Sequence, residues 1–477
     1  MQAIALLALC TFLAALFYTP LCRDLFRRWG IFDRPDAVRK IHAEPVPRVG
    51  GAVFILSMFT TYALTFVFSK INPPVDAHQM ALAWRIVPAA AVVFVTGILD
   101  DLFSLRPWQK LVGQLIGAGW AYWAGLRIAG LAGYSADPWL SLPLTLLWLV
   151  LCTNAFNLID GVDGLATGVG LFATLTMVVA ALLQNNVPLL AVALPVGGFL
   201  LAFLRYNFNP ATVFLGDSGS LLLGFLLGCF GLIWSLKSAT LLGMVAPLMA
   251  MFVPILDVGL SVVRRFLRHQ PVFGADRGHI HHRLLDRGLT PRRAVLLLYA
   301  ACVVGALFSI AHLVAAKQFG GLIVLVFCAA AWIGVQHLGY IEFSLAGRML
   351  LGGSFQQMLA SQLHLRKFEE EFVAATRLEE CYRLLTETCK KFGFTGVIID
   401  FHGQNLRKTL LEQNPETCWT VRIPLAGTGY LNLTRPFDAS EPTAVVPFVR
   451  MLRDILPEKL ESLAQDFHER AFAHTAN

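Results

Sequence analysis

The sequence predicts an all-α protein that crosses a membrane many times, followed by a small α+β domain. Of its 477 residues, 56% are hydrophobic and 14% are charged, and the mean hydropathy is +0.62. This composition is far more apolar than that of a typical soluble protein. Charged residues are concentrated at the end of the chain, where the last 137 residues hold 32 of all 69. We therefore expect a transmembrane domain at residues 1–340 and a cytosolic accessory domain at residues 341–477.

Eleven apolar runs are long enough to cross the roughly 30 Å hydrocarbon core of a bilayer. They cover residues 3–22, 50–69, 85–103, 110–129, 139–156, 163–184, 188–205, 218–236, 239–263, 294–314 and 319–339. The first run has no basic segment before it and no small-residue cleavage site after it. We therefore expect a retained span rather than a cleaved signal peptide.

Basic residues flank the predicted spans mainly on one side. Eighteen arginines and lysines, from Arg23 to Arg293, fall in loops on that side, and five fall on the other. The positive-inside rule makes the richer side cytoplasmic. An odd number of spans then places the N-terminus outside and the C-terminal domain in the cytosol. Because the net charge of +7 gathers beside the spans, we expect membrane lipids and no nucleic acid as partners.

Residues 154–168 place polar groups between two long apolar runs, where an ionised carboxylate is costly. Two amides and two carboxylates recur there at every third position: Asn154, Asn157, Asp160 and Asp163. On an unbroken helix this spacing drifts by about 60° per step, so the four side chains would not converge. Gly161 and Gly164 allow the chain to leave helical geometry. The pattern predicts a broken helix end that lines a polar cleft at the membrane surface.

Two adjacent carboxylates, Asp100 and Asp101, end another apolar span. Neighbouring residues on a helix point about 100° apart, so we expect the two carboxylates to have different partners. The C-terminal end of a helix disfavours acids, which favours a functional role over a solvated helix end. Lys110 follows closely, and it either neutralises substrate phosphates or neutralises these carboxylates. The sequence leaves both interpretations open.

Asp217 lies between glycines and serines directly before an apolar run, so it opens a helix. An acid at this position is also a good N-cap. However, three separate acidic motifs at one membrane face favour Mg²⁺, which takes one or two carboxylates together with substrate phosphates. Mn²⁺ is an alternative ion at such a site.

Three histidines fall within four residues in the loop after the ninth span, and arginines flank them. Such a lobe suits a pyrophosphate, to which arginine gives bidentate contacts. Zinc is the competing interpretation, but no cysteine is near. Upstream, residues 39–42 and 47–51 either bind substrate or serve as positive-inside anchors. Asp257 in the ninth span is either a buried partner of another span or part of the cleft wall.

All of these polar motifs fall at the predicted cytoplasmic ends of spans, and the outer loops are short. A transporter would place its polar site nearer the bilayer midplane. The one-sided arrangement favours an enzyme that joins a cytosolic substrate to a lipid. A transporter, or a scaffold whose working part is the C-terminal domain, are the rival hypotheses.

Together the motifs resemble the polyprenyl-phosphate N-acetylhexosamine-1-phosphate transferases. The matching blocks follow the family order over residues 1 to about 340: 33–51, 97–110, 154–168, 207–220 and 278–293. Ile280 interrupts the histidine run. In this respect the segment resembles that of the branch that uses UDP-GlcNAc. The sister branch, which makes peptidoglycan lipid I from UDP-MurNAc-pentapeptide, is the nearest rival.

The resemblance implies transfer of GlcNAc-1-phosphate from UDP-GlcNAc to undecaprenyl or another polyprenyl phosphate, with release of UMP, at the cytoplasmic face of a bacterial membrane. It implies that Asp217 and Asn157 contact Mg²⁺ and that Asp100 and Asp101 serve the attacking lipid phosphate. Asn154, Asp160 and Asp163 would line the nucleotide pocket. The residues implied to bind substrate phosphates and sugar are Lys110, Arg277, His279, His281, His282 and Arg283, with Lys40, His42 and Arg48 upstream.

The C-terminal segment departs from the common pattern of this family, which often ends near the last span. Residues 369–392 and 442–467 are predicted to be helical, and residues 395–401, 418–423 and 430–434 alternate like strands. The segment is similar to a truncated GAF domain. We expect it to serve dimerisation, partner docking or regulation, and we expect the protein to be a homodimer.

Overall fold

The computed structural model describes residues 2–30, 46–69, 77–128, 130–131, 134–135, 137–235, 241–267, 278–338, 354–401, 404–410, 418–425, 429–437 and 445–475. The chain divides into two compact units, Met1–Tyr340 and Ile341–Asn477. Each unit is described by itself.

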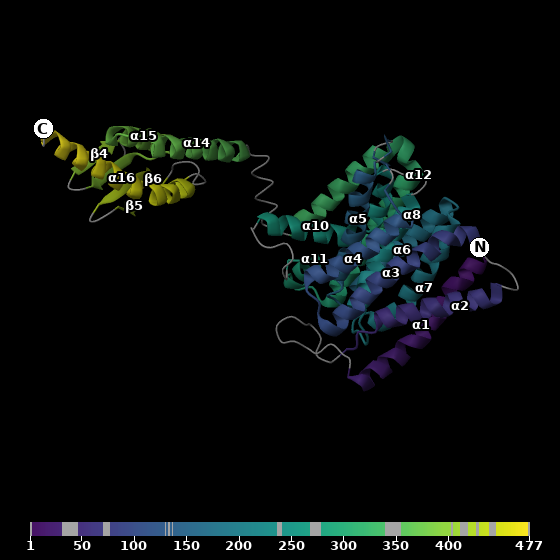
Figure 1. Ribbon diagram of the computed structural model, residues 1–477. Helices are drawn as coiled ribbons and strands as arrows, with labels where there is room; N and C mark the ends of the chain where they lie inside the picture. The colour runs from purple at the N-terminus through teal and green to yellow at the C-terminus, as the bar shows by residue number, and fades with distance from the viewer. Residues whose placement is uncertain are drawn as a thin grey trace. The chain divides into compact units, whose positions relative to one another are not determined.

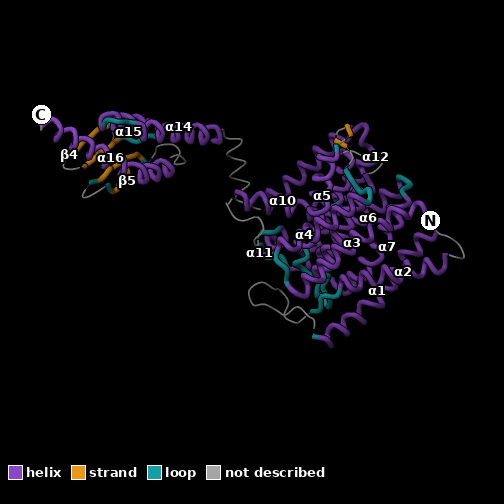
Figure 2. The backbone as a smooth tube through the Cα atoms, in the orientation of Figure 1, coloured by secondary structure: helices purple, strands orange, loops and turns teal. Residues whose placement is uncertain are grey.

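The first unit is a bundle of helices (Figures 1 and 2). Its helices are α1 (Gln2–Trp29), α2 (Gly50–Ser69), α3 (Ala77–Phe103), α4 (Pro107–Trp123), α5 (Pro138–Ile159), α6 (Leu165–Leu183), α7 (Val187–Asn207), α8 (Gly216–Ser235), the 3₁₀ turn η1 (Leu241–Met244), α9 (Val245–Ala250), α10 (Phe252–Leu267), α11 (Ile280–Asp286) and α12 (Pro291–His337). Within the described residues, eight helices are long and apolar enough to cross a membrane. The chain is therefore a polytopic membrane protein, while the count of eleven spans and their orientation stay predictions.

Helix α8 is the central helix of this unit, because nearly all of its side chains are buried. Glycines let neighbouring helices approach it closely. A Cβ atom on Gly97 of α3 would lie 2.4 Å from the Cα atom of Ser218, and one on Gly224 would lie 2.5 Å from the carbonyl oxygen of Cys152 on α5. These crossings bring the polar ends of α3, α5 and α8 together.

Helix α12 contains 47 residues, and a straight helix of that length would span about 70 Å. The rings of Phe308 and Phe327 nevertheless lie 5.5 Å apart, and Arg287, just before the helix, donates a hydrogen bond to the carbonyl of His337 at its end. The helix therefore doubles back on itself. The predicted spans 294–314 and 319–339 are its two arms, and the expected loop between them is helical, with Gly320 and Gly321 in the bend.

The ninth predicted span, residues 239–263, is broken into η1, α9 and α10 rather than forming one helix. Pro254 has no N–H to donate to the carbonyl of Ala250, so a continuous helix would lose that hydrogen bond. Placed in the first turn of α10, the proline loses nothing, because the first N–H groups of a helix have no partner within it.

The second unit is an α+β fold, which agrees with the class that the sequence predicts. It contains α14 (Ser354–Ala374), α15 (Leu378–Lys391) and α16 (Val445–Thr475) with the strands β3 (Gly396–Phe401), β4 (Gln404–Thr409), β5 (Cys418–Pro424) and β6 (Tyr430–Pro436). The sheet is antiparallel in the order β4-β3-β6-β5. Val397 and Leu433 pair across β3 and β6 and pack in the core with Phe448 of α16. Strand β4 was not predicted, and residues 375–377 interrupt the helix expected at 369–392.

Candidate active site

Asp101, in the last turn of α3, holds the first turn of α8. Its Oδ1 accepts a hydrogen bond from the backbone N–H of Asp217, and its Oδ2 accepts one from that of Ser218, both at 2.9 Å. A carboxylate is favourable there because backbone N–H groups and the positive end of the helix dipole face it. Gly216 takes φ +76° directly before this contact, where a side chain would be strained. Residues 116 positions apart are thus joined.

Asp100 has different partners, as its adjacent position on the helix predicts. Its Oδ1 accepts a hydrogen bond from the backbone N–H of Leu105 at 2.8 Å, and its Oδ2 forms an ion pair with Lys110 Nζ. Lys110 Nζ also lies 3.6 Å from Asp217 Oδ1. Lys110 therefore links the end of α3 to the start of α8 and neutralises carboxylates from both helices.

Asp217 also contacts two polar groups from distant parts of the chain, Asn157 and Arg48. Asn157 Nδ2 donates a hydrogen bond to its Oδ1 at 2.6 Å and another to Ser220 Oγ at 3.0 Å. Arg48 Nη1 lies 3.6 Å from Asp217 Oδ2 and 3.4 Å from Asp101 Oδ1. The backbone beside Arg48 is fixed by a hydrogen bond from Phe214 N to Pro47 O at 2.9 Å. Arg48 is therefore part of the carboxylate cluster.

The break predicted after Asn157 lies at residues 160–164, between α5 and α6. Gly164 takes φ +77°, and the hydroxyl of Tyr299 donates a hydrogen bond to its carbonyl oxygen at 2.6 Å. The carboxylate of Asp160 is half-buried in this turn and accepts no hydrogen bond from the described residues. Burial raises the pKa of Asp160 well above its usual range, and the nearby charges of Asp217 and Asp101 raise it further.

Carboxylates outnumber basic groups in this cluster. Its carboxylates are Asp100, Asp101, Asp160 and Asp217, and its cations among the described residues are Arg48 and Lys110. With every group ionised, the balance is −2, which a divalent cation would neutralise. The described side chains form no group of three or more His, Cys, Asp or Glu around one position. A cation here would take one or two carboxylates and complete its shell with phosphate oxygens and water, as Mg²⁺ does.

Asn154 and Asp163 make contacts that organise the protein itself. Asn154 on α5 exchanges two hydrogen bonds with Gln114 on α4, of 3.2 and 2.6 Å. Asp163 Oδ2 accepts hydrogen bonds from Asn209 Nδ2 and Ala211 N, both at 3.0 Å. These contacts fix residues 160–164 against the segment that leads into α8. A direct contact of Asn154 or Asp163 with a nucleotide stays a prediction.

The histidine segment is fixed by Asp257, which lies in α10 with 2% of its surface exposed. Asp257 Oδ1 accepts a hydrogen bond from the backbone N–H of Ile280 at 2.7 Å, and Oδ2 lies 3.1 Å from Nδ1 of His279. A carboxylate at this position suits the His279 tautomer that has its N–H group at Nδ1. Arg264, about two turns further along α10, donates a hydrogen bond to the carbonyl of Gly278 at 2.8 Å.

His281 reaches from this segment to the turn after α5. Its Nε2 lies 3.3 Å from where a Cβ atom on Gly161 would be, and its ring is parallel to that of His279, with centroids 5.7 Å apart. Burial lowers the pKa of His281 to about 3, and His282 beside it contributes. His281 is therefore neutral at pH 7. Gly161 leaves room for this ring, so the histidine segment and the carboxylate turn are in contact.

His282 and Arg283 are half-buried in the first turn of α11, next to His281. Lys40, His42 and Arg277 lie outside the described residues. For Asp257 the sequence left open a buried partner on another span or a place in the cleft wall, and the structure gives it His279 and Ile280 as partners. The structure adds that Gly161, predicted as a break in the helix, leaves room for the ring of His281, and that Arg264 binds the carbonyl of Gly278.

Sequence comparison with known proteins identifies the family of this chain. Residues 83–235 match the family described as Glycosyl transferase family 4. The chain is 35% identical over 307 residues to a probable undecaprenyl-phosphate N-acetylglucosaminyl 1-phosphate transferase of Bacillus subtilis (strain 168), which covers 63% of this chain and 82% of that protein. It is 32% identical over 339 residues to the decaprenyl-phosphate N-acetylglucosaminephosphotransferase of Mycobacterium tuberculosis (strain H37Rv), which covers 63% of this chain and 80% of that protein.

A phospho-N-acetylmuramoyl-pentapeptide-transferase of Levilactobacillus brevis is 31% identical over 194 residues, which is 37% of this chain and 58% of that protein. This match is much shorter than the other two. The identity over most of the length of the first relatives, together with the joined motifs at the start of α8, shows that the chain belongs to glycosyl transferase family 4, among the polyprenyl-phosphate N-acetylhexosamine-1-phosphate transferases.

Proposed function

We propose that the protein transfers GlcNAc-1-phosphate from UDP-GlcNAc to undecaprenyl or another polyprenyl phosphate, giving polyprenyl-diphospho-GlcNAc and UMP. The observation that carries this proposal is the convergence of Asp101, Lys110 and Arg48 on Asp217 at the start of α8. The names of the two long matches supply the substrate class. UDP-MurNAc-pentapeptide is the less favoured donor, because the match to that branch is shorter.

The reaction joins two anions. An oxygen of the lipid phosphate attacks the sugar-linked phosphorus of the donor. The bond from that phosphorus to the bridging oxygen breaks, and UMP leaves with that oxygen and the electron pair. A phosphate monoester has a second pKa near 6, so the attacking group is largely deprotonated at neutral pH. The protein therefore has to neutralise charge and align the reactants more than it has to remove a proton.

The described side chains suggest a division of roles. Lys110 and Arg48 would draw the two phosphate groups to the cluster, since both lie at its edge with 24% and 33% of their side chains exposed. Asp101 has both oxygens occupied by α8 and would hold the start of that helix in place. Asp100 would orient Lys110. These assignments favour a single displacement, and a phosphorylated enzyme trapped without lipid acceptor would overturn that preference.

Mg²⁺ fits the donor set, because the cluster is oxygen-rich and its four carboxylates outnumber its two cations among the described residues. Asp217 would hold the ion, with Asp160 as the carboxylate that accepts no hydrogen bond from the described part of the chain. Asn157 would orient Asp217 through its N–H group or ligate the ion through its oxygen. When bound, the ion would stabilise the negative charge that develops on the transferred phosphoryl group.

The orientation and the number of spans belong to the same proposal. The eight apolar helices, the second arm of α12, the 17-residue α4 and the broken η1–α10 segment together support eleven crossings. With the basic loops inside, the active site and the second unit face the cytosol of a bacterial cell. A homodimer completes the proposal and rests on the sequence prediction alone.

The test is release of UMP from UDP-GlcNAc by the purified protein with polyprenyl phosphate, with and without Mg²⁺. UDP-MurNAc-pentapeptide replaces the donor in a parallel reaction. We expect release with UDP-GlcNAc and Mg²⁺, and a loss of about 10²- to 10³-fold in Asp217→Asn, the scale on which removal of one transition-state contact acts. Asp137→Asn at the opposite, exposed end of α5 is the matched control. Release only with the pentapeptide donor would refute the proposed substrate.

A further inference from the structure

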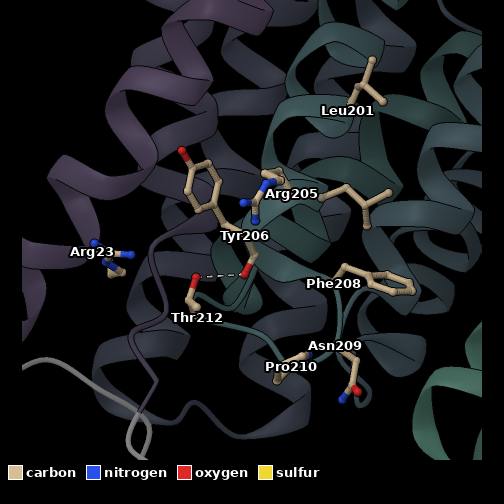
Figure 3. A pocket seen from close by; sticks show the side chains of 9 residues that line it. Arg23, Leu201, Arg205, Tyr206, Phe208, Asn209, Pro210 and Thr212 are labelled. Atoms are coloured by element: carbon tan, nitrogen blue, oxygen red, sulfur yellow. Dashed lines mark hydrogen bonds between the residues drawn. The ribbon is translucent and has the colours of Figure 1, made fainter.

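A cavity of about 770 Å³ opens between α1 and α7, apart from the carboxylate cluster (Figure 3). Its lining residues are Arg23, Leu201, Leu204, Arg205, Tyr206, Phe208, Asn209, Pro210 and Thr212. It lies at the active-site end of the bundle, because the segment after α7 that forms its wall leads directly into α8 and Asp217. The volume is in the range of known small-molecule sites, about 300–1,000 Å³.

Two arginines from different helices face this cavity. Arg23 projects from α1, and its Nε donates a hydrogen bond to Asp24 at 2.8 Å, which leaves the two terminal nitrogens of its guanidinium group. Arg205 is exposed in the last turn of α7 and makes no hydrogen bond or ion pair within the described part of the chain. Guanidinium groups bind phosphate oxygens through paired N–H donors, so the cavity offers an anion two such groups.

The apolar side of the cavity is placed for a hydrocarbon chain. Leu201 lies one helical turn before Arg205, which is about 6 Å deeper in the span, and 54% of its surface is exposed. Leu204 and Phe208 extend this apolar wall. A cation at the end of a span with apolar groups one turn below it matches a lipid whose headgroup lies at the interface.

The walls are held in place by the protein's own hydrogen bonds. The hydroxyl of Tyr206 donates to the carbonyl of Leu16 at 3.4 Å, which ties α7 to α1. Thr212 Oγ1 donates to the carbonyl of Tyr206 at 3.1 Å, as Figure 3 shows. Asn209, at the mouth, is fixed by Asp163. The cavity is therefore formed before any ligand arrives.

We propose that this cavity binds the phosphate headgroup of an anionic phospholipid from the leaflet at the active-site face, with Arg23 and Arg205 on the phosphate and an acyl chain along Leu201 and Leu204. This lipid is distinct from the polyprenyl phosphate that reacts. The reacting phosphate has to reach Lys110 and the carboxylate cluster, and in the described part of the chain Arg23 and Arg205 pair with none of those carboxylates.

The test measures bound lipid, so it does not depend on the transferase reaction. The full-length protein is delipidated in neutral detergent and titrated with phosphatidylglycerol, and the bound lipid is counted by native mass spectrometry. The double variant Arg23→Gln/Arg205→Gln should bind at least about tenfold more weakly, since each charge-assisted contact contributes about a factor of ten. The control Arg27→Gln/Arg28→Gln removes the same charge from α1 outside the cavity and should bind like the wild type.

The single variant Arg205→Gln keeps the test valid if the double variant does not fold, because Arg205 is exposed and its loss breaks no hydrogen bond among described residues. It should weaken binding by severalfold or more. Equal weakening in the Arg27→Gln/Arg28→Gln control would overturn the proposal in favour of general electrostatic attraction.

Two competition arms separate the possible phosphate sources. Inorganic phosphate at millimolar concentration should leave phosphatidylglycerol bound, and its displacement would identify a site for free phosphate instead. Polyprenyl phosphate should not displace phosphatidylglycerol mole for mole. If it did, and if Arg205→Gln raised the KM for polyprenyl phosphate, the cavity would belong to the reacting lipid and the proposal would be wrong.

Discussion

Replacing Asp257 by Asn tests whether the contacts of Asp257 with the histidine segment are needed for the reaction. The carboxylate of Asp257 is buried. It accepts a hydrogen bond from the backbone N–H of Ile280 at 2.7 Å and lies 3.1 Å from Nδ1 of His279. Asn keeps one acceptor but places an NH₂ group where His279 now donates, which forces the other tautomer or breaks the contact. A hydrogen bond to a charged group contributes about 1.5–3 kcal/mol, so we expect kcat/KM for UDP-GlcNAc to fall about 10- to 100-fold.

The assay is steady-state UMP release with each substrate varied in turn, together with thermal unfolding in detergent. The family resemblance implies that the histidine segment binds the phosphates and sugar of the donor. If it does, Asp257→Asn should raise the KM for UDP-GlcNAc and leave the KM for polyprenyl phosphate within a factor of about two. Asp286→Asn, at the exposed end of the same short helix α11, should behave like the wild type. If Asp257→Asn also stayed within threefold of the wild type, the proposed coupling of Asp257 to the substrate would be wrong.

Three further results are expected. Gly97→Ala should lower the free energy of unfolding by about 1–3 kcal/mol, because the added Cβ would lie 2.4 Å from Ser218 Cα. The control Gly119→Ala on α4 meets nothing within 4 Å and should leave the free energy of unfolding unchanged in the same assay. The folded state keeps His281 neutral down to about pH 3, so stability should be full above about pH 6.5 and fall by about 1.4 kcal/mol per unit below it, a slope that should shrink in His281→Gln. Removal of residues 341–477 should leave UMP release by the first unit within about threefold of the full chain, because every described site residue precedes Tyr340, and loss of activity in a folded truncation would contradict this.

The sequence predicted the residues of the site more completely than it predicted the contacts between them. The adjacent positions of Asp100 and Asp101 predicted separate partners, and the contacts confirm it. For Lys110 the sequence left two interpretations open. Its ion pair with Asp100 shows that it neutralises this carboxylate, and its binding to substrate phosphates stays a prediction. The partner of Asp257 was not predictable, because His279 is separated from it by a loop whose course no local pattern specifies.

The helix pattern was predicted well where one apolar run made one helix. The run at 50–69 is α2. The errors lie where backbone hydrogen bonding and hydrophobicity disagree. Residues 239–263 are apolar throughout, but Pro254 prevents one continuous helix. Residues 315–320 look like a loop because Lys317 and Gly320 interrupt the apolar pattern, yet the backbone stays helical through the bend. Hydropathy measures how apolar a segment is. It does not report the hydrogen bond lost at Pro254 or the continuity of the helix through the bend.

The attachment of α11 has an evolutionary consequence. The parts proposed to carry out phosphoryl transfer are built into the crowded centre around α8, where a single added methyl group would collide with a neighbour. The seven residues of α11 are held at their start by Asp257 of α10, and Gly161 leaves room for the ring of His281. If the histidine segment binds the sugar, as the resemblance implies, relatives with different donors should differ most in these contacts and least around α8.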